Sequence, residues 1–273
     1  MALAQLGSSD DKNDNLQRAG EFMRRAAEMG ASLTVFPEVF MSHFPEGTEL
    51  RTVRHNAESI DGAFVDGMRG LAHEHHQWVV FGMNEAPPDA EEPRVFNSTL
   101  IANADGDLVG VYRKTHLYDA FGAKESDRIR PGDSLFEPID TPFGKLGLFV
   151  CYELRFPEIA RYQALRGADV IVVPSGWVRG PMKEYHWKTL VTARAIENTV
   201  FILACDQVSD HYCGQSLVVD PMGVPLASAG EEECLVVCDI DLDRIRSVRG
   251  KLPSSKHRRE ELFSSALGHS GKG

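Results

Sequence analysis

The sequence is poor in cysteine and has no long apolar run. Its 273 residues include five cysteines, an odd and sparse set that does not fit the disulfide framework of a small secreted domain. No apolar run approaches the roughly 20 residues that a membrane-spanning helix requires. The N-terminus lacks the basic segment that opens a signal peptide. These absences predict a cytoplasmic protein that does not bind a membrane.

Basic residues are also scarce. Lys and Arg number 29 against 40 Asp and Glu, which gives a formal net charge of −11. Nonspecific binding to nucleic acid or to anionic lipid needs a positive surface, so neither is expected as a partner. An anionic small molecule is still compatible with this charge, because a single local cation can bind it.

Common cofactor and metal motifs are missing as well. The sequence contains no glycine-rich phosphate loop, no dinucleotide fingerprint and no Gly-x-Ser-x-Gly nucleophile elbow. The histidine-rich cluster at 73–76 lacks the His pair at i, i+4 of a zinc-binding helix. Cys234 and Cys238 have no second pair of ligands beside them. We therefore expect no cofactor and no metal site.

What the sequence does contain is an alternation of short apolar runs and helical stretches. Strands are expected at 2–6, 33–36, 78–83, 96–102, 108–112, 146–150, 170–173, 200–205, 216–219 and 235–240, and helices at 13–29, 58–75, 156–166, 185–198 and from 241 onward. This mixture of alternating elements and hairpins predicts an α/β fold, a sandwich of two sheets flanked by helices. No linker or repeat is visible. We therefore expect a single domain over residues 1–273, with a loose tail from about residue 265.

Cys151 stands where an expected strand ends. The strand at 146–150 stops at this residue, and a helix follows from 156 with Pro157 in its first turn. A thiol between a strand end and a helix start lies beside free backbone N–H groups and the positive end of a helix dipole, which favour the thiolate. A cysteine in an apolar setting can also be a buried structural thiol. The local sequence leaves both interpretations open.

Two more polar residues directly follow apolar runs. Glu38 comes after the strand at 33–36, and Lys114 after the strand at 108–112. Ligand sites collect at strand ends in α/β folds, although strands also end in polar residues simply because loops are solvated. Together with Cys151, Glu38 and Lys114 could carry out one defined reaction. The carboxylate takes the thiol proton, the thiolate attacks a carbonyl or nitrile carbon, and the ammonium and the backbone N–H of Tyr152 stabilise the oxyanion.

These residues lie in segments that resemble the three signature blocks of the nitrilase, or carbon–nitrogen hydrolase, superfamily. The blocks are Phe36-Pro37-Glu38, Tyr112-Arg113-Lys114-Thr115-His116-Leu117 and Cys151-Tyr152-Glu153-Leu154-Arg155-Phe156-Pro157. Shorter matches follow the family order at Asn97-Ser98, Glu125-Ser126, 193–198, 214–216 and 220–223. The resemblance spans nearly the whole chain.

The resemblance implies roles for four residues. Glu38 would be the general base, Lys114 the oxyanion-stabilising lysine and Cys151 the nucleophile, while Glu125 would lie near the lysine and help to position substrate. It also implies a four-layer α-β-β-α sandwich that pairs into an αββα-αββα homodimer or a higher homo-oligomer. The helix after Cys151 and the helix at 185–198 would form the contact. The first strand is shorter than in many members of the family.

The residues after the nucleophile narrow the range of expected substrates. The run from Cys151 to Glu158 resembles the Nit-type branch, which includes ω-amidases and deaminated glutathione amidases and hydrolyses ω-amides of dicarboxylic acids. Tyr152 departs from the Cys-Trp-Glu of typical nitrilases. Arg155 either grips a substrate carboxylate or pairs with an acid such as Glu158 or Glu184.

Trp177 follows the strand at 170–173. It either walls the substrate pocket, as in the resembled fold, or is a core tryptophan. The expected function is thus hydrolysis of a small amide through a cysteine thioester, with release of ammonia. Two alternatives stay open: the same residues could act on a nitrile or an N-carbamoyl compound, or the chain could be a non-catalytic binding protein that keeps the fold.

Overall fold

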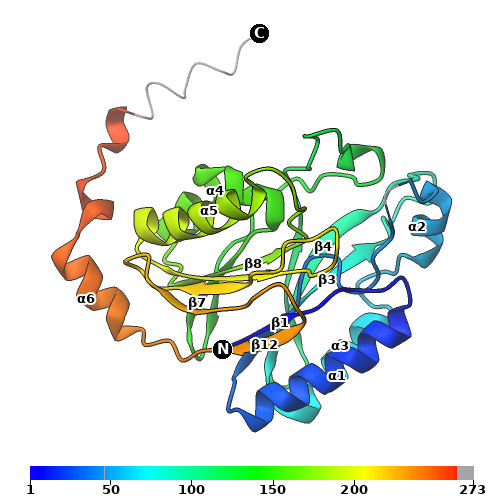
Figure 1. Cartoon of the computed structure of the whole chain (residues 1–273), viewed down its shortest axis with the longest axis horizontal. Coiled ribbons are helices and arrows are strands. Elements are labelled where there is room, and N and C mark those ends of the chain that lie inside the picture. Colours follow the sequence, from blue (N-terminus) through cyan, green and yellow to red (C-terminus); the bar gives the residue numbers. More distant parts are fainter. Residues whose placement is uncertain (46, 263–273) are drawn as a thin grey trace.

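The computed structural model describes residues 1–45 and 47–262, so the tail expected from about residue 265 lies outside the described residues. The described chain forms two β-sheets that pack face to face, with helices over both outer faces (Figure 1). This is the four-layer α-β-β-α sandwich predicted from the sequence. Within these ranges no helix is long and apolar enough to cross a membrane.

The first sheet has six strands, which span Ala2–Gln5 (β1), Leu33–Val35 (β2), Trp78–Glu85 (β3), Phe96–Ala102 (β4), Leu108–Arg113 (β5) and Cys234–Val237 (β12). Their order across the sheet is β12-β1-β2-β3-β4-β5. β1, β2 and β3 are parallel, and the other pairings are antiparallel. Two antiparallel steps return β5 to the direction of β3, so β2 and β5 end at the same edge of the sheet.

The second sheet repeats this plan. Its strands span Ile139–Thr141 (β6), Gly144–Leu148 (β7), Val170–Ser175 (β8), Phe201–Asp206 (β9), Leu217–Val219 (β10) and Pro225–Ser228 (β11), in the order β11-β10-β9-β8-β7-β6. β7, β8 and β9 are parallel, with antiparallel strands on either side. Each sheet therefore has a parallel centre whose carboxyl ends form one edge.

Helices cover the outer faces. α1 (Lys12–Glu28) and α3 (Ala63–His75) lie against the first sheet, and α4 (Pro157–Leu165) and α5 (Lys183–Asn198) lie on the second (Figure 1). α2 (Leu50–Asn56) lies beyond the end of the first sheet, and α6 (Asp243–Lys251) follows β12. Between the sheets, apolar residues of both form one cluster, which includes Leu3, Val35, Val80, Val172 and Leu203.

The sequence of α1 shows why a helix forms here. Asp11 caps the N-terminus, and its side chain accepts hydrogen bonds from the backbone N–H groups of residues 13 and 14. Ala19, Phe22, Met23 and Ala26 are buried, at the i, i+3, i+4 and i+7 spacing of one helix face. The apolar face therefore packs on the first sheet while the charged face meets solvent.

Some expected elements differ from the structure. The helix expected at 58–75 begins only at Ala63, because Glu58 pairs with Glu85 in an isolated bridge and its carboxylate accepts a hydrogen bond from the N–H of Phe64. The sequence analysis also missed α2, β6 and β11, which are short and largely exposed or polar. Periodicity is a weak signal in segments of this kind.

The strand ends bring the predicted site together. Glu38 follows β2 and Lys114 follows β5, so both come from the carboxyl edge of the first sheet. Cys151 follows β7 and Gly176 follows β8, at the carboxyl edge of the second sheet. The backbone N–H of Gly176 donates to the Glu38 carboxylate at 2.8 Å, so the two edges meet directly. Each sheet supplies one half of the site.

Candidate active site

The nucleophile candidate occupies a strained turn. Cys151 has a φ of 48°, a left-handed conformation that costs a non-glycine residue about 1–3 kcal/mol. It opens a short 3₁₀ helix, η2 (Cys151–Arg155), and α4 starts only at Pro157. The fold places the side chain beside the two sheet edges and leaves it 7% exposed.

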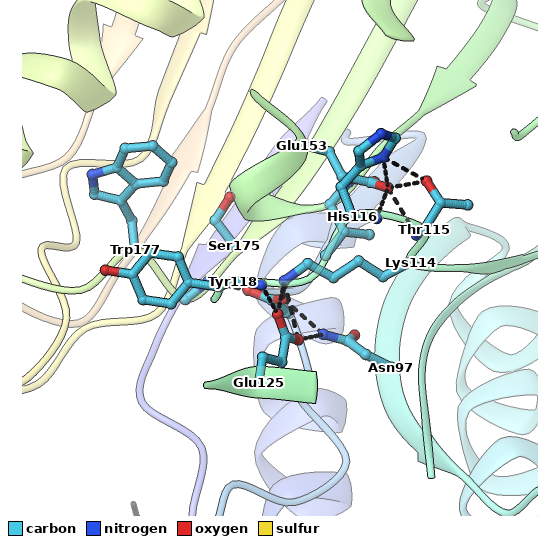
Figure 2. Close-up of polar contacts among 12 residues, drawn as sticks. Asn97, Lys114, Thr115, His116, Tyr118, Glu125, Glu153, Ser175 and Trp177 are labelled. Atoms are coloured by element: carbon cyan, nitrogen blue, oxygen red, sulfur yellow. Dashed lines mark hydrogen bonds and ion pairs between the residues drawn. The ribbon is translucent and has the colours of Figure 1, made fainter. Parts of the chain in front are cut away.

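A cluster of charged and polar groups surrounds the Lys114 ammonium. Its Nζ lies 2.8 Å from Glu38 Oε1 and 2.9 Å from Glu125 Oε2, and only 2% of the lysine is exposed. Asn97 Nδ2 donates to Glu38 at 2.8 Å and to Glu125 at 3.2 Å. Figure 2 shows Lys114, Glu125 and Asn97 converging from separate segments. The predicted residues Glu38, Lys114 and Glu125 therefore form one contact group, and the Cys151 thiol bonds with Glu38.

Backbone groups fix both carboxylates in place. Glu38 Oε2 accepts from the N–H of Gly176, and the Glu38 carbonyl accepts from Gln207 Nε2 at 2.8 Å. Glu125 lies in the short helix η1 (Glu125–Asp127), and its Oε2 accepts from the N–H of Tyr118 at 2.6 Å. Each carboxylate is thereby oriented toward Lys114 before any substrate is bound.

The electrostatics of the cluster set the resting protonation states. Burial alone would raise the pKa of Glu38, but the Lys114 ammonium and hydrogen bonds from Lys114, Cys151 and Asn97 hold it below its ordinary value. Desolvation opposes the charge of Lys114, yet Glu125 and Glu38 raise its pKa well above the ordinary value. Burial raises the pKa of the Cys151 thiol well above its usual range, and the Glu38 carboxylate raises it further.

The expectation that a position between a strand end and a helix start favours the thiolate of Cys151 is therefore wrong for the resting site. The 3₁₀ turn after Cys151 is too short to carry much of a helix dipole, and α4 begins six residues after the thiol. Among neighbouring charges, the Glu38 carboxylate has the largest effect on the pKa of the thiol, and it raises that pKa. The resting pair is a neutral thiol beside an ionised carboxylate, ready for proton transfer to the carboxylate.

A second carboxylate braces the nucleophile turn. Glu153 is fully buried, and its Oε1 accepts from Tyr112 Oη at 2.6 Å, from Thr115 Oγ1 at 2.7 Å and from the Thr115 N–H at 2.9 Å. Its Oε2 accepts from the N–H of Val150 at 2.8 Å. Figure 2 shows Glu153 beside Thr115 and His116. Glu153 thus ties the segment that carries Lys114 to the turn that carries Cys151.

A narrow pocket opens at Cys151. It is lined by Tyr118, Cys151, Tyr152, Arg155, Gly176, Trp177, Val178 and Lys183. All three predicted substrate-binding residues, Tyr152, Arg155 and Trp177, therefore line it. A wider hollow beside β5 contains residues 109–113 and 133–137 but lies away from the thiol.

Arg155 does not make the ion pairs considered for it. Its guanidinium lies over the Trp177 ring, with Cζ 4.7 Å from the ring centroid. Its Nε and Nη2 are buried without a hydrogen-bond partner among the described residues. Trp177 is 3% exposed, and its indole N–H donates to the Lys183 carbonyl at 2.8 Å. It is therefore both a well-packed tryptophan and a pocket wall.

Several residues of this site had no role in the sequence analysis. Asn97 and Glu153 lie inside matched blocks, but their contacts depend on how those blocks fold together. Tyr118 and Lys183 lie outside the blocks and meet only in three dimensions, with Lys183 Nζ 3.0 Å from Tyr118 Oη. A buried position for Lys183 could not be read from a polar stretch of sequence.

Comparisons with known proteins show which family the chain resembles along its length. A family profile described as carbon-nitrogen hydrolase matches residues 1–250. Deaminated glutathione amidase from Escherichia coli O157:H7 is 34% identical over 259 residues, which are 95% of this chain and 97% of that protein. Omega-amidase NIT2 from Homo sapiens is also 34% identical, over 281 residues that cover 97% of this chain and 96% of that protein.

A solved structure extends the similarity to three dimensions. A variant of the amidase from Nesterenkonia sp. AN1 has a TM-score of 0.81 at 26% identity, with 97% of this chain and 96% of that chain covered. In that structure the acetamide moiety of fluoroacetamide is covalently added at the active-site cysteine. The likeness therefore includes the fold as well as the sequence.

Proposed function

This chain belongs to the carbon–nitrogen hydrolase family and is an amidase-type enzyme acting on C–N bonds other than peptide bonds; from that premise we propose that it hydrolyses a small, carboxylate-bearing amide through a thioester on Cys151. The observation that carries the proposal is the buried contact of Lys114 with both Glu38 and Glu125 beside the thiol.

The acylation step follows from the protonation states. Glu38 accepts the thiol proton as Cys151 Sγ attacks the amide carbon, so a neutral thiol never has to ionise into solvent. Negative charge then develops on the amide oxygen. The Lys114 ammonium and the backbone N–H of Tyr152 stabilise it. When the tetrahedral intermediate collapses, the proton on Glu38 passes to the leaving nitrogen, ammonia departs and the acyl group stays on sulfur.

Deacylation uses the same groups in reverse. Glu38 takes a proton from water as the water oxygen attacks the thioester carbon. The C–S bond breaks, the proton returns to Cys151, and the acid product leaves. Glu125 keeps the Lys114 ammonium oriented through both steps, which is the role that its hydrogen bond with the Tyr118 backbone supports.

The preference for a carboxylate-bearing amide rests on Arg155. Among the described residues its Nε and Nη2 are buried without a partner, and Arg155 lines the pocket that contains the nucleophile. Unpaired buried donors favour a ligand that accepts hydrogen bonds from them. The similar proteins named as omega-amidase and deaminated glutathione amidase support an ω-amidase type of substrate. A nitrile or N-carbamoyl substrate would use the same catalytic residues but has no such support.

The test is ammonia release by the purified protein and by Cys151→Ala. The variant should lose at least about 1,000-fold in kcat/KM, because no other group can form the acyl-enzyme. Cys238→Ala, which removes a partly buried thiol directly after β12, is the matched control and should keep its activity. Undiminished ammonia release by Cys151→Ala would contradict the mechanism, while assays on ω-amides, nitriles and N-carbamoyl amino acids would separate the substrate classes.

We also propose that residues 1–273 form a single domain, which the family match over residues 1–250 supports, and that the chain pairs into a homodimer through α4 and α5. Leu165, Tyr185 and Ile196 on these helices are 48%, 62% and 44% exposed. Light scattering in solution tests the pairing. A strictly monomeric mass across micromolar concentrations would rule it out.

A further inference from the structure

Lys183 is a buried ammonium that has no acidic partner among the described residues. It is the first residue of α5 and is only 5% exposed. Its Nζ bonds with the hydroxyl of Tyr118, a neutral group, at 3.0 Å. Within residues 1–45 and 47–262 its remaining neighbours are aromatic faces, at 4.8 Å for Tyr118, 4.6 Å for Phe121 and 5.3 Å for Trp177. A buried cation of this kind is costly unless an anion joins it.

Arg155 and Lys183 share the same surroundings. Both line the pocket that holds Cys151, and both lie over Trp177 and Phe121. The guanidinium is 4.7 Å from the Trp177 centroid and the ammonium is 5.3 Å from it. Two cations therefore line one pocket around the same pair of aromatic rings, and the aromatic faces offset only part of the cost of burying them.

The donors at this end exceed the acceptors. Arg155 Nε and Nη2 have no partner in the part of the chain that the structure describes, and the Lys183 ammonium has three donors of which the Tyr118 hydroxyl accepts one. α5 begins here without a side-chain cap, so its dipole adds positive potential at the same place. A carboxylate, with two oxygens and about four acceptor positions, satisfies all of these groups together.

We propose that Lys183 and Arg155 form a two-cation subsite that holds the carboxylate at the far end of the acyl group. Lys183 is then a second specificity-determining residue beside Arg155, and it acts on the choice between amides with and without this carboxylate. This inference rests on the proposed amidase function and names the chemistry that selects its substrate. A neutral aliphatic amide would leave both cations unpaired in a closed pocket.

Tyr118 connects this subsite with the catalytic cluster. Its hydroxyl bonds with Lys183, while its backbone N–H donates to Glu125 at 2.6 Å. Figure 2 shows Tyr118 between Trp177 and the group formed by Glu125 and Lys114. A carboxylate bound between the cations would therefore hold the segment that orients Glu125. The subsite can thus affect turnover as well as binding.

The experiment compares two amides of matched shape. One is succinamate; the other is 4-methylpentanamide, in which an isopropyl group replaces the carboxylate. The wild-type enzyme should favour succinamate in kcat/KM. Lys183→Met should reduce this preference by about 10- to 100-fold, the effect expected when a hydrogen bond to a charged group is removed. Lys183→Arg, which keeps the charge, should retain most of it.

Lys188→Met is the matched control, since Lys188 lies on the same helix but is exposed. Its preference should equal that of the wild-type enzyme. A preference in Lys183→Met within twofold of the wild-type value would overturn the proposal. Thermal unfolding of each variant checks that the fold is kept.

A binding measurement covers the case in which a variant turns over poorly. Succinate should bind Cys151→Ala in calorimetry, and adding Lys183→Met should weaken its Kd by at least about tenfold. Equal affinity in the two proteins would refute the subsite. The two proposals fail differently: Cys151-dependent ammonia release without any carboxylate preference removes only the subsite, whereas ammonia release that persists in Cys151→Ala removes the amidase mechanism itself.

Discussion

Two buried glutamates flank the nucleophile, and they differ in their partners. Glu38 faces an ammonium, an amide and a thiol, and its bond with the thiol involves a proton that can move. Glu153 faces backbone N–H groups and hydroxyls whose protons stay where they are, and the imidazole Nδ1 of His116 lies 3.6 Å from its Oε1. Burial favours the neutral form of both, yet both have a pKa below the ordinary value. In Glu38 a cation is the main opposing influence, whereas in Glu153 hydrogen bonds are.

The difference shows how one residue type serves two purposes. A charge partner that can adjust as charge develops suits a group that gains and loses a proton. A set of fixed donors suits a carboxylate that stays ionised, because protonation would turn one accepting oxygen into a donor that faces other donors. Glu38 is thus placed to react, and Glu153 is placed to hold the backbone around Cys151.

The largest expected effect is on activity, and it distinguishes Glu38 from Glu153. Glu38→Gln removes the proton acceptor but keeps the shape, and kcat/KM for ammonia release should fall by about 100- to 10,000-fold. The unfolding temperature should change little, because Lys114 keeps its contact with Glu125. Steady-state assays and thermal unfolding measure both quantities. Activity within tenfold of the wild-type value would mean that another group takes the proton.

The next largest effect is on stability, and it should be seen when Glu153 is replaced. Glu153→Gln replaces one accepting oxygen by an NH₂ group that faces donors, so the free energy of unfolding should drop by about 1–3 kcal/mol. Activity should fall less than in Glu38→Gln, through misplacement of Lys114 and Cys151. Urea unfolding provides the measurement, with the exposed Glu158→Gln as a control that should stay near the wild-type value. An unchanged free energy of unfolding would show that Glu153 does not stabilise the turn at Cys151.

The smallest expected effect is on how the unfolding temperature changes at low pH. A carboxyl whose folded pKa is depressed adds stability above its unfolded pKa and loses it as pH falls through the folded value. Both Glu38 and Glu153 have a lowered pKa, so unfolding temperature should decline below about pH 4.3, the ordinary value for glutamate. Glu153→Gln should show a shallower decline. Parallel curves for wild type and variant between pH 7 and 3 would contradict this contribution.

The sequence was sufficient for the parts of the site that lie at strand ends. An apolar run followed by a polar residue located Glu38, Lys114 and Cys151, and the structure places all three together, while their roles in catalysis stay proposals. The layered fold was predicted because strand and helix periodicities are strong in long, half-buried elements. Short exposed segments such as α2 carry no such signal.

What the sequence could not give depends on contacts between distant segments. The direction of the Cys151 pKa was mispredicted, since a local argument about the helix start could not include the Glu38 carboxylate. The burial of Lys183 depends on aromatic residues from two other loops. The partners of Glu153 come from residues 112–116, so its position in the nucleophile block revealed nothing about its task.

The division of the site between two sheets has a mechanical consequence. Glu38 and Lys114 move with the first sheet and Cys151 with the second, so a small slide of one sheet over the other would change the distance between base and nucleophile. The apolar contacts between the sheets therefore keep the base and the nucleophile aligned. Cys205 lies outside the pocket but belongs to this packing, because its thiol donates to the Val35 carbonyl of the opposite sheet at 3.2 Å. A substitution between the sheets should therefore lower the activity, by shifting one sheet against the other, before it unfolds the protein.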